Sequence, residues 1–265
     1  MAPPDPTELR DLAERIAVPL GRRLLAEGRE RAQHQDTKTS ATDLVTDADR
    51  WVESQLVEQL LAARPGDGVL GEEGADRPSD TGVVWVIDPI DGTTNFVYGY
   101  PGYNISVAAQ VDGATVAGVV VDVVHAEVFA AALGAGATRD GHPIRCNDAA
   151  DLGHALVATG FGYRAEQRTR QAQLLTRVLP AVRDIRRGGA AAVDLCWVGC
   201  GRVDGYYEEG LKAWDLAAGG LVAAEAGAVV AGVPAAASAD GHSTPELTVA
   251  APPALFDALC DLVAP

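Results

Sequence analysis

One stretch carries most of the information about this chain: Trp85-Val86-Ile87-Asp88-Pro89-Ile90-Asp91-Gly92-Thr93-Thr94-Asn95-Phe96. Its apolar start predicts a buried strand that stops at Asp88, because Pro89 fixes φ and is expected to turn the chain. Two carboxylates around such a turn, Asp88 and Asp91, can converge on one point and suit a hard cation such as Mg²⁺. The backbone N–H groups of Gly92 and Thr93 would open a helix and attract an anion. The pattern predicts metal ligands beside a phosphate cradle, with a plain Asp-rich turn as the alternative.

Further acidic residues stand at the ends of other predicted elements. Glu72 follows the short apolar run 69–70, which predicts a second buried strand. Asp49 forms a capping box with Thr46 at the start of a helix whose apolar face is formed by residues 52, 56 and 60. Asp215 opens an Ala-rich helix, where the helix dipole favours an acid. Taken singly, Asp49 and Asp215 are typical of helix caps.

The remaining pattern predicts a mixed α/β sandwich of stacked layers. An amphipathic helix spans Leu9 to Leu24, and Pro19 should kink or divide it. A polar loop is expected at 34–41 and an antiparallel meander at 104–131, with a turn at 112–113. Strands near 155–159 and 203–207 should alternate with helices near 165–180, 190–200 and 214–226, and residues 233–239 should form a loop or strand edge. We expect one domain, 1–265, with sub-domains of about 1–150 and 151–265.

Composition excludes several classes of protein. Apolar residues make up 48% of the 265 residues and charged residues 22%, which rules out a disordered or fibrous chain. The net charge of −16 disfavours nucleic acid and acidic membrane surfaces as partners. The four cysteines contain no CxxC pair and are expected to be reduced core thiols. Because the N-terminal stretch has acids where a signal peptide needs basic residues, and no apolar run is long enough to span a membrane, we expect a cytoplasmic protein.

The acidic motifs together resemble those of one known family. The segments that carry the resemblance are 71–73 (GEE), 88–93 (DPIDGT) and 214–219 (WDLAAG), supported by 43–49 with Lys38 upstream, 186–195 and 201–208. In this order they resemble the inositol monophosphatase family of Mg²⁺-dependent, lithium-sensitive phosphatases, from about residue 8 to residue 262. The resemblance implies a layered αβαβα sandwich of the sugar-phosphatase type, usually in a homodimer, that binds a small phosphate ester.

The resemblance also assigns roles to matching residues. Two or three Mg²⁺ ions would be held: the first by Glu72, Asp88 and the Ile90 carbonyl, the second by Asp88, Asp91 and Asp215, and a weaker third by Glu72. The catalytic residues would be Glu72, Thr93 and Asp49, the last helping to orient the attacking water. Contacts to the substrate would come from Asp91, Gly92, Thr93, Ala191, Glu208 and Asp215. A metal-activated water needs no histidine base and no covalent intermediate. Because Asp91 would hold a metal and support no core, Asp91→Asn is expected to nearly abolish turnover and to leave the fold intact.

The residues after Gly-Thr bear on the substrate. The form DGTTNF at 91–96 is typical of inositol monophosphatases, and Glu208 matches the acid that accepts hydrogen bonds from substrate hydroxyls in that family. We therefore expect hydrolysis of myo-inositol monophosphate. Histidinol phosphate, fructose 1,6-bisphosphate and a biosynthetic sugar phosphate remain alternative substrates. A catalytically inactive binding or regulatory module on the same fold is an alternative of a different class, which the intact acidic set opposes.

Several residues depart from the family pattern or have an open role. Ala190 lacks the usual hydroxyl, and Gly188 and Gly162 replace bulkier residues, so affinity or preference is expected to differ. Lys212 would either meet a second anionic group or be solvated. Arg186 and Arg187 are expected to make structural or dimer-interface contacts.

Overall fold

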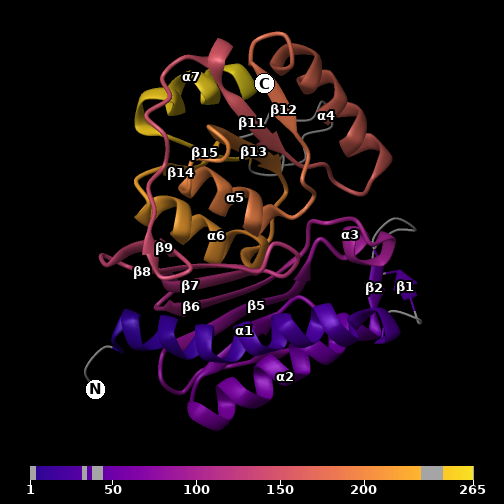
Figure 1. The fold of residues 1–265 in the computed structure, drawn as a ribbon, viewed down its shortest axis with the longest axis vertical. Coiled ribbons are helices and arrows are strands. Elements are labelled where there is room, and N and C mark those ends of the chain that lie inside the picture. Colours follow the sequence, from indigo (N-terminus) through magenta and orange to yellow (C-terminus); the bar gives the residue numbers. More distant parts are fainter. Residues whose placement is uncertain (1–3, 32–34, 38–43, 234–246, 265) are drawn as a thin grey trace.

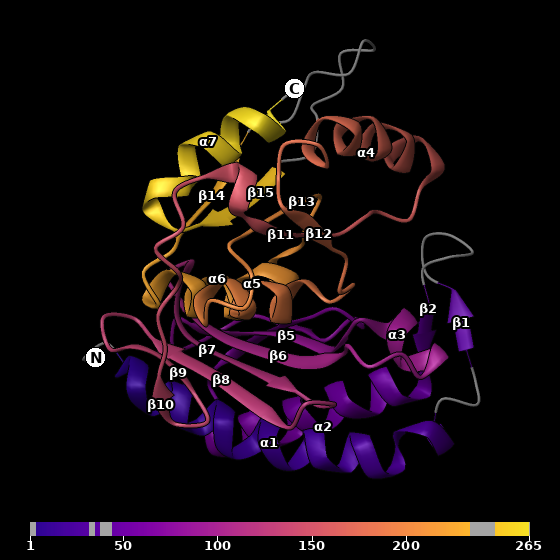
Figure 2. The same cartoon turned by 45° about the horizontal axis from the view of Figure 1, so that its top comes forward.

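The computed structural model describes residues 4–31, 35–37, 44–233 and 247–264, and its elements stack as helices, sheet, helices, sheet, helices (Figure 1). Helices α1 (Pro6–Arg31) and α2 (Asp47–Ala63) cover the outer face of the first sheet. Helices α5 (Ala191–Gly199) and α6 (Ala213–Glu225) lie between the two sheets, and α4 (Ala165–Val178) and α7 (Pro253–Val263) lie beyond the second (Figure 2). This order confirms the predicted αβαβα sandwich.

The first sheet has the order β10-β9-β8-β7-β6-β5-β3-β4. Only β3 and β5 are parallel to each other, and the other neighbours are antiparallel. The predicted meander is confirmed as β6, β7 and β8. The strands are β3 (Gly68–Gly71), β4 (Asp76–Arg77), β5 (Val83–Asp91), β6 (Asn104–Val111), β7 (Ala114–Asp122), β8 (Glu127–Ala132), β9 (Gly136–Arg139) and β10 (His142–Pro143).

Both faces of this sheet are buried, which explains the nearly continuous apolar runs in its strands. Side chains of a strand point alternately to opposite faces. Trp85 and Ile87 accordingly belong to the core under α1 and α2, whereas Val86 belongs to the core under α5 and α6. The layer of α5 and α6 comes from the second half of the chain, so both halves contribute to this core. The division into sub-domains stays a prediction.

The second sheet is smaller and has the order β12-β11-β13-β15-β14. Here β11 is parallel to β12 and β13, while β15 is antiparallel to β13 and β14. Its strands are β11 (Leu156–Thr159), β12 (Asp184–Arg186), β13 (Gly205–Glu209), β14 (Val229–Val233) and β15 (Leu247–Ala251). A short turn of 3₁₀-helix, η1 (Leu152–His154), precedes β11. The predicted strands and helices of this half are confirmed, and of the segment 233–239 only Val233, at the end of β14, falls within the described residues.

The structure contradicts one prediction about proline and part of another. The strand β5 does not stop at Asp88 but continues to Asp91, and its register against β6 shifts between these two residues. Such an irregularity opens the ladder locally, so the N–H that Pro89 lacks is not needed there. Helix α1 is likewise not divided at Pro19. Proline inside a helix costs about 3 kcal/mol. Burial of each large apolar side chain on this face of α1 contributes about 1.5–3 kcal/mol, so burial of the whole face offsets the cost of Pro19. The large buried side chains are Leu9, Leu12, Ile16, Leu20 and Leu24.

The predicted polar loop at 34–41 is wrong for the part of it that the structure describes. Residues Gln35–Thr37 form strand β1, which pairs antiparallel with β2 (Leu44–Thr46). The rest of that segment lies outside the described residues. No helix within the described ranges is long and apolar enough to cross a membrane.

Candidate active site

The first acidic pair lies where strand β3 ends beside β5, which continues to Asp91. Gly71 of β3 pairs with Ile87 of β5, and the N–H of Glu72 donates to the Ile87 carbonyl at 3.1 Å. Because β3 and β5 are parallel and Gly71 pairs with Ile87, the residues that follow this pair, Glu72 and Asp88, lie next to each other. A hydrogen bond between the Glu72 and Asp88 side chains is among the interactions that raise the pKa of Asp88. The sheet thus joins two residues that are separated in the sequence.

Asp88 is a buried acid surrounded by other acids. Its side chain is buried, and its Oδ1 atom has no hydrogen-bond partner. Burial raises the pKa of Asp88 well above its usual value, and the charges of Glu72, Asp91 and Asp215 raise it further. A buried anion without compensation is costly, so this arrangement calls for a positive charge beside Asp88.

Asp91 has a second role that sequence reasoning missed. Its Oδ2 accepts hydrogen bonds from Asn104 Nδ2 at 2.9 Å and from the Ala192 N–H at 2.7 Å, and its Oδ1 accepts from the Ala191 N–H at 3.2 Å. Burial raises the pKa of Asp91 to about 6, against the opposing effect of these hydrogen bonds. The carboxylate therefore ties the end of β5 to β6 and to the first turn of α5. Three donors depend on this carboxylate, so Asp91→Asn is expected to weaken this tie, and the effect of the substitution on the fold stays a prediction.

The Gly-Thr turn opens helix α3 (Thr93–Tyr98), as the sequence predicted. Gly92 adopts the left-handed conformation, with φ of 90°, and a Cβ atom there would lie 2.8 Å from the Gly102 carbonyl oxygen. Only glycine fits this position without strain. The first helical hydrogen bond runs from the Phe96 N–H to the Gly92 carbonyl, so the N–H groups of residues 93–95 precede the hydrogen-bond ladder. These groups are the ones an anion would use.

Thr93 and Asp49 meet as the sequence predicted. Thr93 Oγ1 lies 3.1 Å from Asp49 Oδ1 and 3.0 Å from the Ile90 carbonyl oxygen. Asp49 Oδ2 accepts from the N–H of Thr46 at 2.8 Å and from its hydroxyl at 2.6 Å, which confirms the predicted capping box. The box fixes Asp49, and Asp49 in turn orients the Thr93 hydroxyl.

The other proposed contacts come from the second half of the chain. Asp215 lies in the first turn of α6, where its Oδ2 accepts from the Lys212 N–H at 2.7 Å. Burial and the charge of Asp91 raise the pKa of Asp215 well above its usual value. Glu208 lies on β13 and accepts a hydrogen bond from the Tyr206 hydroxyl at 2.6 Å. Burial raises the pKa of Glu208 to about 7, and Asp91 contributes. Because the charge of Asp91 raises the pKa values of both acids, Asp215 and Glu208 lie within electrostatic range of Asp91.

The donor set fits a hard divalent cation. All the gathered side chains offer oxygen, and the buried Asp88 Oδ1 lacks any partner. Within the described residues, however, no three acidic, histidine or cysteine side chains already lie at the spacing of a formed metal site. The pKa effects of these carboxylates on Asp88 nevertheless place them in one region. No described histidine lies among them: His125 contacts Asp122 and His154 contacts Asp151.

Polar residues that the sequence did not single out support the site from behind. Asn95 Nδ2 donates to the carbonyl oxygens of Gly102, at 2.6 Å, and of Gly188, at 2.9 Å, and so fastens the turn before α5 to the phosphate turn. Asn104 stands directly opposite Asp91 in the β5–β6 pairing. Predicting that hairpin with its register would have identified Asn104; Asn95 gave no comparable signal.

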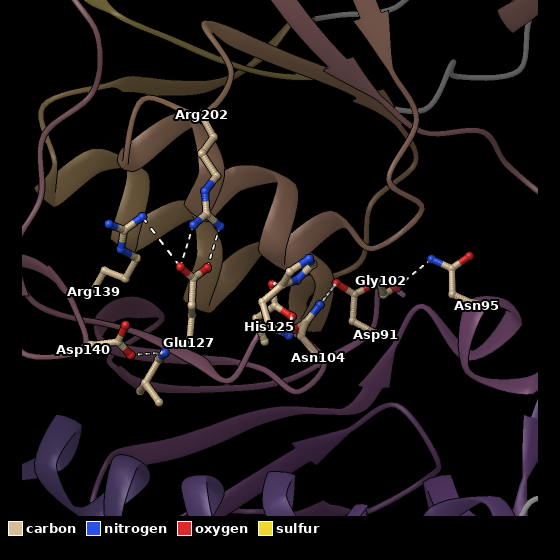
Figure 3. A network of polar contacts seen from close by, with 11 residues as sticks. Asp91, Asn95, Gly102, Asn104, His125, Glu127, Arg139, Asp140 and Arg202 are labelled. Carbon is tan, nitrogen blue, oxygen red and sulfur yellow. Dashed lines mark hydrogen bonds and ion pairs between the residues drawn. The ribbon is translucent and has the colours of Figure 1, made fainter. Parts of the chain in front are cut away.

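A second polar cluster lies along the same sheet but has a different character (Figure 3). Glu127 of β8 accepts two hydrogen bonds from Arg202 and forms an ion pair with Arg139 at 3.7 Å. Hydrogen bonding to Arg202 lowers the pKa of Glu127. Figure 3 shows this cluster on one side of His125 and the Asn104–Asp91 contact on the other. Its charges are compensated, unlike those around Asp88.

The comparisons with known proteins agree on one relationship. Residues 5–263 match the inositol monophosphatase family. Inositol-1-monophosphatase SuhB of Mycobacterium tuberculosis is 48% identical, over 96% of this chain and 93% of that protein. A solved structure of Mycobacterium tuberculosis SuhB superposes with a TM-score of 0.83 over 98% of this chain and 97% of that chain, at 41% identity. The Nus factor SuhB of Pasteurella multocida is 40% identical over 78% of this chain and 79% of that protein.

Proposed function

The chain belongs to the inositol monophosphatase family, and we propose that it hydrolyses myo-inositol monophosphate to inositol and phosphate with Mg²⁺. The observation that carries the proposal is the buried Asp88, whose unpartnered Oδ1 lies in the field of three further carboxylates, three residues before the end of β5, which leads into the Gly92–Thr93 turn. The substrate follows from the name of the relative at 48% identity and from the DGTTNF sequence.

We assign each residue a proposed role from the chemistry of its side chain. Glu72, Asp88, Asp91, Asp215 and the Ile90 carbonyl would hold two or three Mg²⁺ ions. Bound Mg²⁺ would acidify a coordinated water and neutralise charge on the phosphoryl oxygens. The Thr93 hydroxyl, held by Asp49, would orient that water, with Glu72 completing the catalytic set. The N–H groups of Gly92 and Thr93 would donate to the phosphoryl oxygens, and Ala191, Glu208, Asp91 and Asp215 would contact the polyol.

Phosphate release with a panel of esters tests the proposal. We expect the largest kcat/KM for myo-inositol monophosphate, activity that chelation removes and Mg²⁺ restores, and inhibition by Li⁺. A preference of more than about tenfold for histidinol phosphate, fructose 1,6-bisphosphate or another sugar phosphate would overturn the substrate. Activity that is indifferent to chelation would overturn the metal ligands, and absence of any phosphatase activity would favour the inactive binding module.

Assembly and location form the remaining part of the proposal. We propose a homodimer, supported by the exposed aromatic side chains of Tyr98 and Tyr100. We propose a cytoplasmic location, supported by four unpaired cysteines, of which Cys146 and Cys196 are buried and Cys200 and Cys260 are partly buried. We also propose no nucleic-acid partner, because of the net charge of −16, although some relatives bear the name Nus factor. Light scattering measures whether the protein is a dimer, and a nucleic-acid binding assay tests whether it binds nucleic acid.

A further inference from the structure

The turn before α5 carries an arginine whose position the sequence left open. Arg187 is exposed, and its guanidinium folds back over Gly189: a Cβ atom at Gly189 would lie 2.1 Å from Arg187 Nη1 and 3.3 Å from Asn95 Nδ2. Gly189 also has φ of 84°, which favours glycine. Asn95 ties this turn to the phosphate turn through the Gly188 carbonyl. The guanidinium therefore lies beside the turn that would hold the phosphoryl group.

Two carboxylates lie within range of this guanidinium. Asp194, in the first turn of α5, is buried and its Oδ1 has no hydrogen-bond partner. It occupies the space that Gly188 leaves open, since a Cβ atom at Gly188 would lie 2.6 Å from Asp194 Oδ1. Glu208 is pressed against Gly160 in the same way, with its Oε2 1.9 Å from a Cβ atom placed there. The charge of Arg187 lowers the pKa values of both acids, against burial that raises them.

We propose that Arg187 is a specificity-determining residue for polyol phosphates: its guanidinium donates hydrogen bonds to the polyol hydroxyl oxygens, beside Glu208, which accepts hydrogen bonds from the hydroxyl groups. Asp194 acts through Arg187 as a positioning residue, because its buried carboxyl group fills the space at Gly188, on the turn that carries the guanidinium. This inference rests on the proposed function and gives a role to a residue first interpreted as structural.

The chemistry of a hydroxyl group favours this pairing of an acid and an arginine. A hydroxyl both donates and accepts, so a carboxylate alone satisfies only half of its capacity. Arginine offers five donors and no acceptor, which complements Glu208. The occupant that fits is therefore a ring carrying neighbouring hydroxyl groups.

Kinetics on two substrates test the role of Arg187. We compare myo-inositol 1-phosphate with p-nitrophenyl phosphate, an ester that lacks hydroxyl groups, in the full chain with Mg²⁺. For Arg187→Gln we expect KM for the inositol ester to rise about tenfold, the effect of losing a charge-assisted hydrogen bond, with kcat unchanged. The kcat/KM for p-nitrophenyl phosphate should stay within about twofold. Arg187→Lys keeps the charge and should recover part of the loss.

A matched control and a second variant separate recognition from structure. Arg183 is an exposed arginine on the same segment, and Arg183→Gln should leave both substrates unaffected. Asp194→Asn should raise KM for the inositol ester alone, and less than additively with Arg187→Gln. Equal losses on both substrates, or an unchanged KM in Arg187→Gln, would overturn the role of Arg187. By contrast, wild-type protein that hydrolyses only p-nitrophenyl phosphate would refute the proposed substrate.

Discussion

The acids around Asp88 and the cluster around Glu127 lie along the same sheet, yet the protein treats their charges in opposite ways. Burial and neighbouring acids raise the pKa of Asp88, whereas hydrogen bonding to Arg202 lowers the pKa of Glu127. Glu127 has both of its oxygen atoms paired with one guanidinium, while Asp88 has an oxygen with no partner. The difference supports the proposal that the first group binds a cation, whereas the charges of the second are already compensated within the fold.

Asp88→Asn should have the largest effect on activity and should not destabilise the fold. The substitution removes a proposed metal ligand, so we expect kcat/KM to fall by about a hundredfold or more. It also removes a buried charge that repels its neighbours, so the metal-free variant should unfold at a higher temperature than the wild type. Mg²⁺-dependent phosphate release and thermal unfolding with a chelator measure the two effects. Retained activity would show that Asp88 holds no essential metal.

Asp91→Asn should, in contrast, lose both activity and stability. An amide in place of this carboxylate leaves at least one of the donors from Asn104, Ala191 and Ala192 without its acceptor. An unsatisfied buried donor costs about 1–3 kcal/mol. Urea unfolding with and without chelator gives the free energy, and Asp88→Asn serves as the matched control. Equal stability of the two variants would mean that the tie between β5 and α5 contributes little.

The pH dependence of stability should differ between the chelated and Mg²⁺-loaded proteins. Asp91, with a folded-state pKa raised to about 6, and Asp88, raised well above its usual value, bind more protons when folded than when unfolded. Stability of the chelated protein should therefore fall as pH rises from about 4 through 6 and beyond, by up to about 3 kcal/mol for Asp91 alone. Mg²⁺ should flatten this decline, which thermal unfolding at a series of pH values would reveal. A chelated protein that gains stability over this range would contradict the assignment.

Glu127→Gln should have the smallest effect: it should lower stability and leave activity unchanged. Loss of the paired contacts to Arg202 and Arg139 is expected to lower the free energy of unfolding by about 1–2 kcal/mol, since this pair is partly buried. The kcat/KM for myo-inositol monophosphate should stay within about twofold of the wild-type value. If activity fell as far as stability, the cluster around Glu127 would have to be coupled to the site.

Local sequence predicted the parts of the site that are built within one segment. The capping box of Thr46 and Asp49, the helix that begins at Thr93 and the apolar strands beside Asp88 all follow from spacing and residue type, and the structure confirms them. The contact between Thr93 and Asp49 also came from the resemblance to a known family and is confirmed. The proposed metal and substrate contacts stay predictions until a ligand is bound.

Contacts between residues far apart in the sequence could not be predicted, because no local pattern encodes them. Pro89 alone predicted the end of a strand, but pairing of β5 with β6 carried the strand on to Asp91. The sequence predicted Asp91 only as a metal ligand. In the structure, the first turn of α5, 100 residues away, donates backbone hydrogen bonds to its carboxylate. The sequence indicated only a structural or dimer-interface role for Arg187 and no role for Asp194, because their positions depend on the space left by Gly188 and Gly189.

The sequence by itself determined the layered architecture, the acidic residues and the family, since periodicity and short motifs are local properties of the chain. Only the tertiary structure decided which acids are left uncompensated and which are paired. That outcome depends on burial and on charges brought together from distant segments, as with Asp88 beside Glu72 and Glu127 beside Arg202. Electrostatic energy depends on distance and on exclusion of water, and the fold sets both.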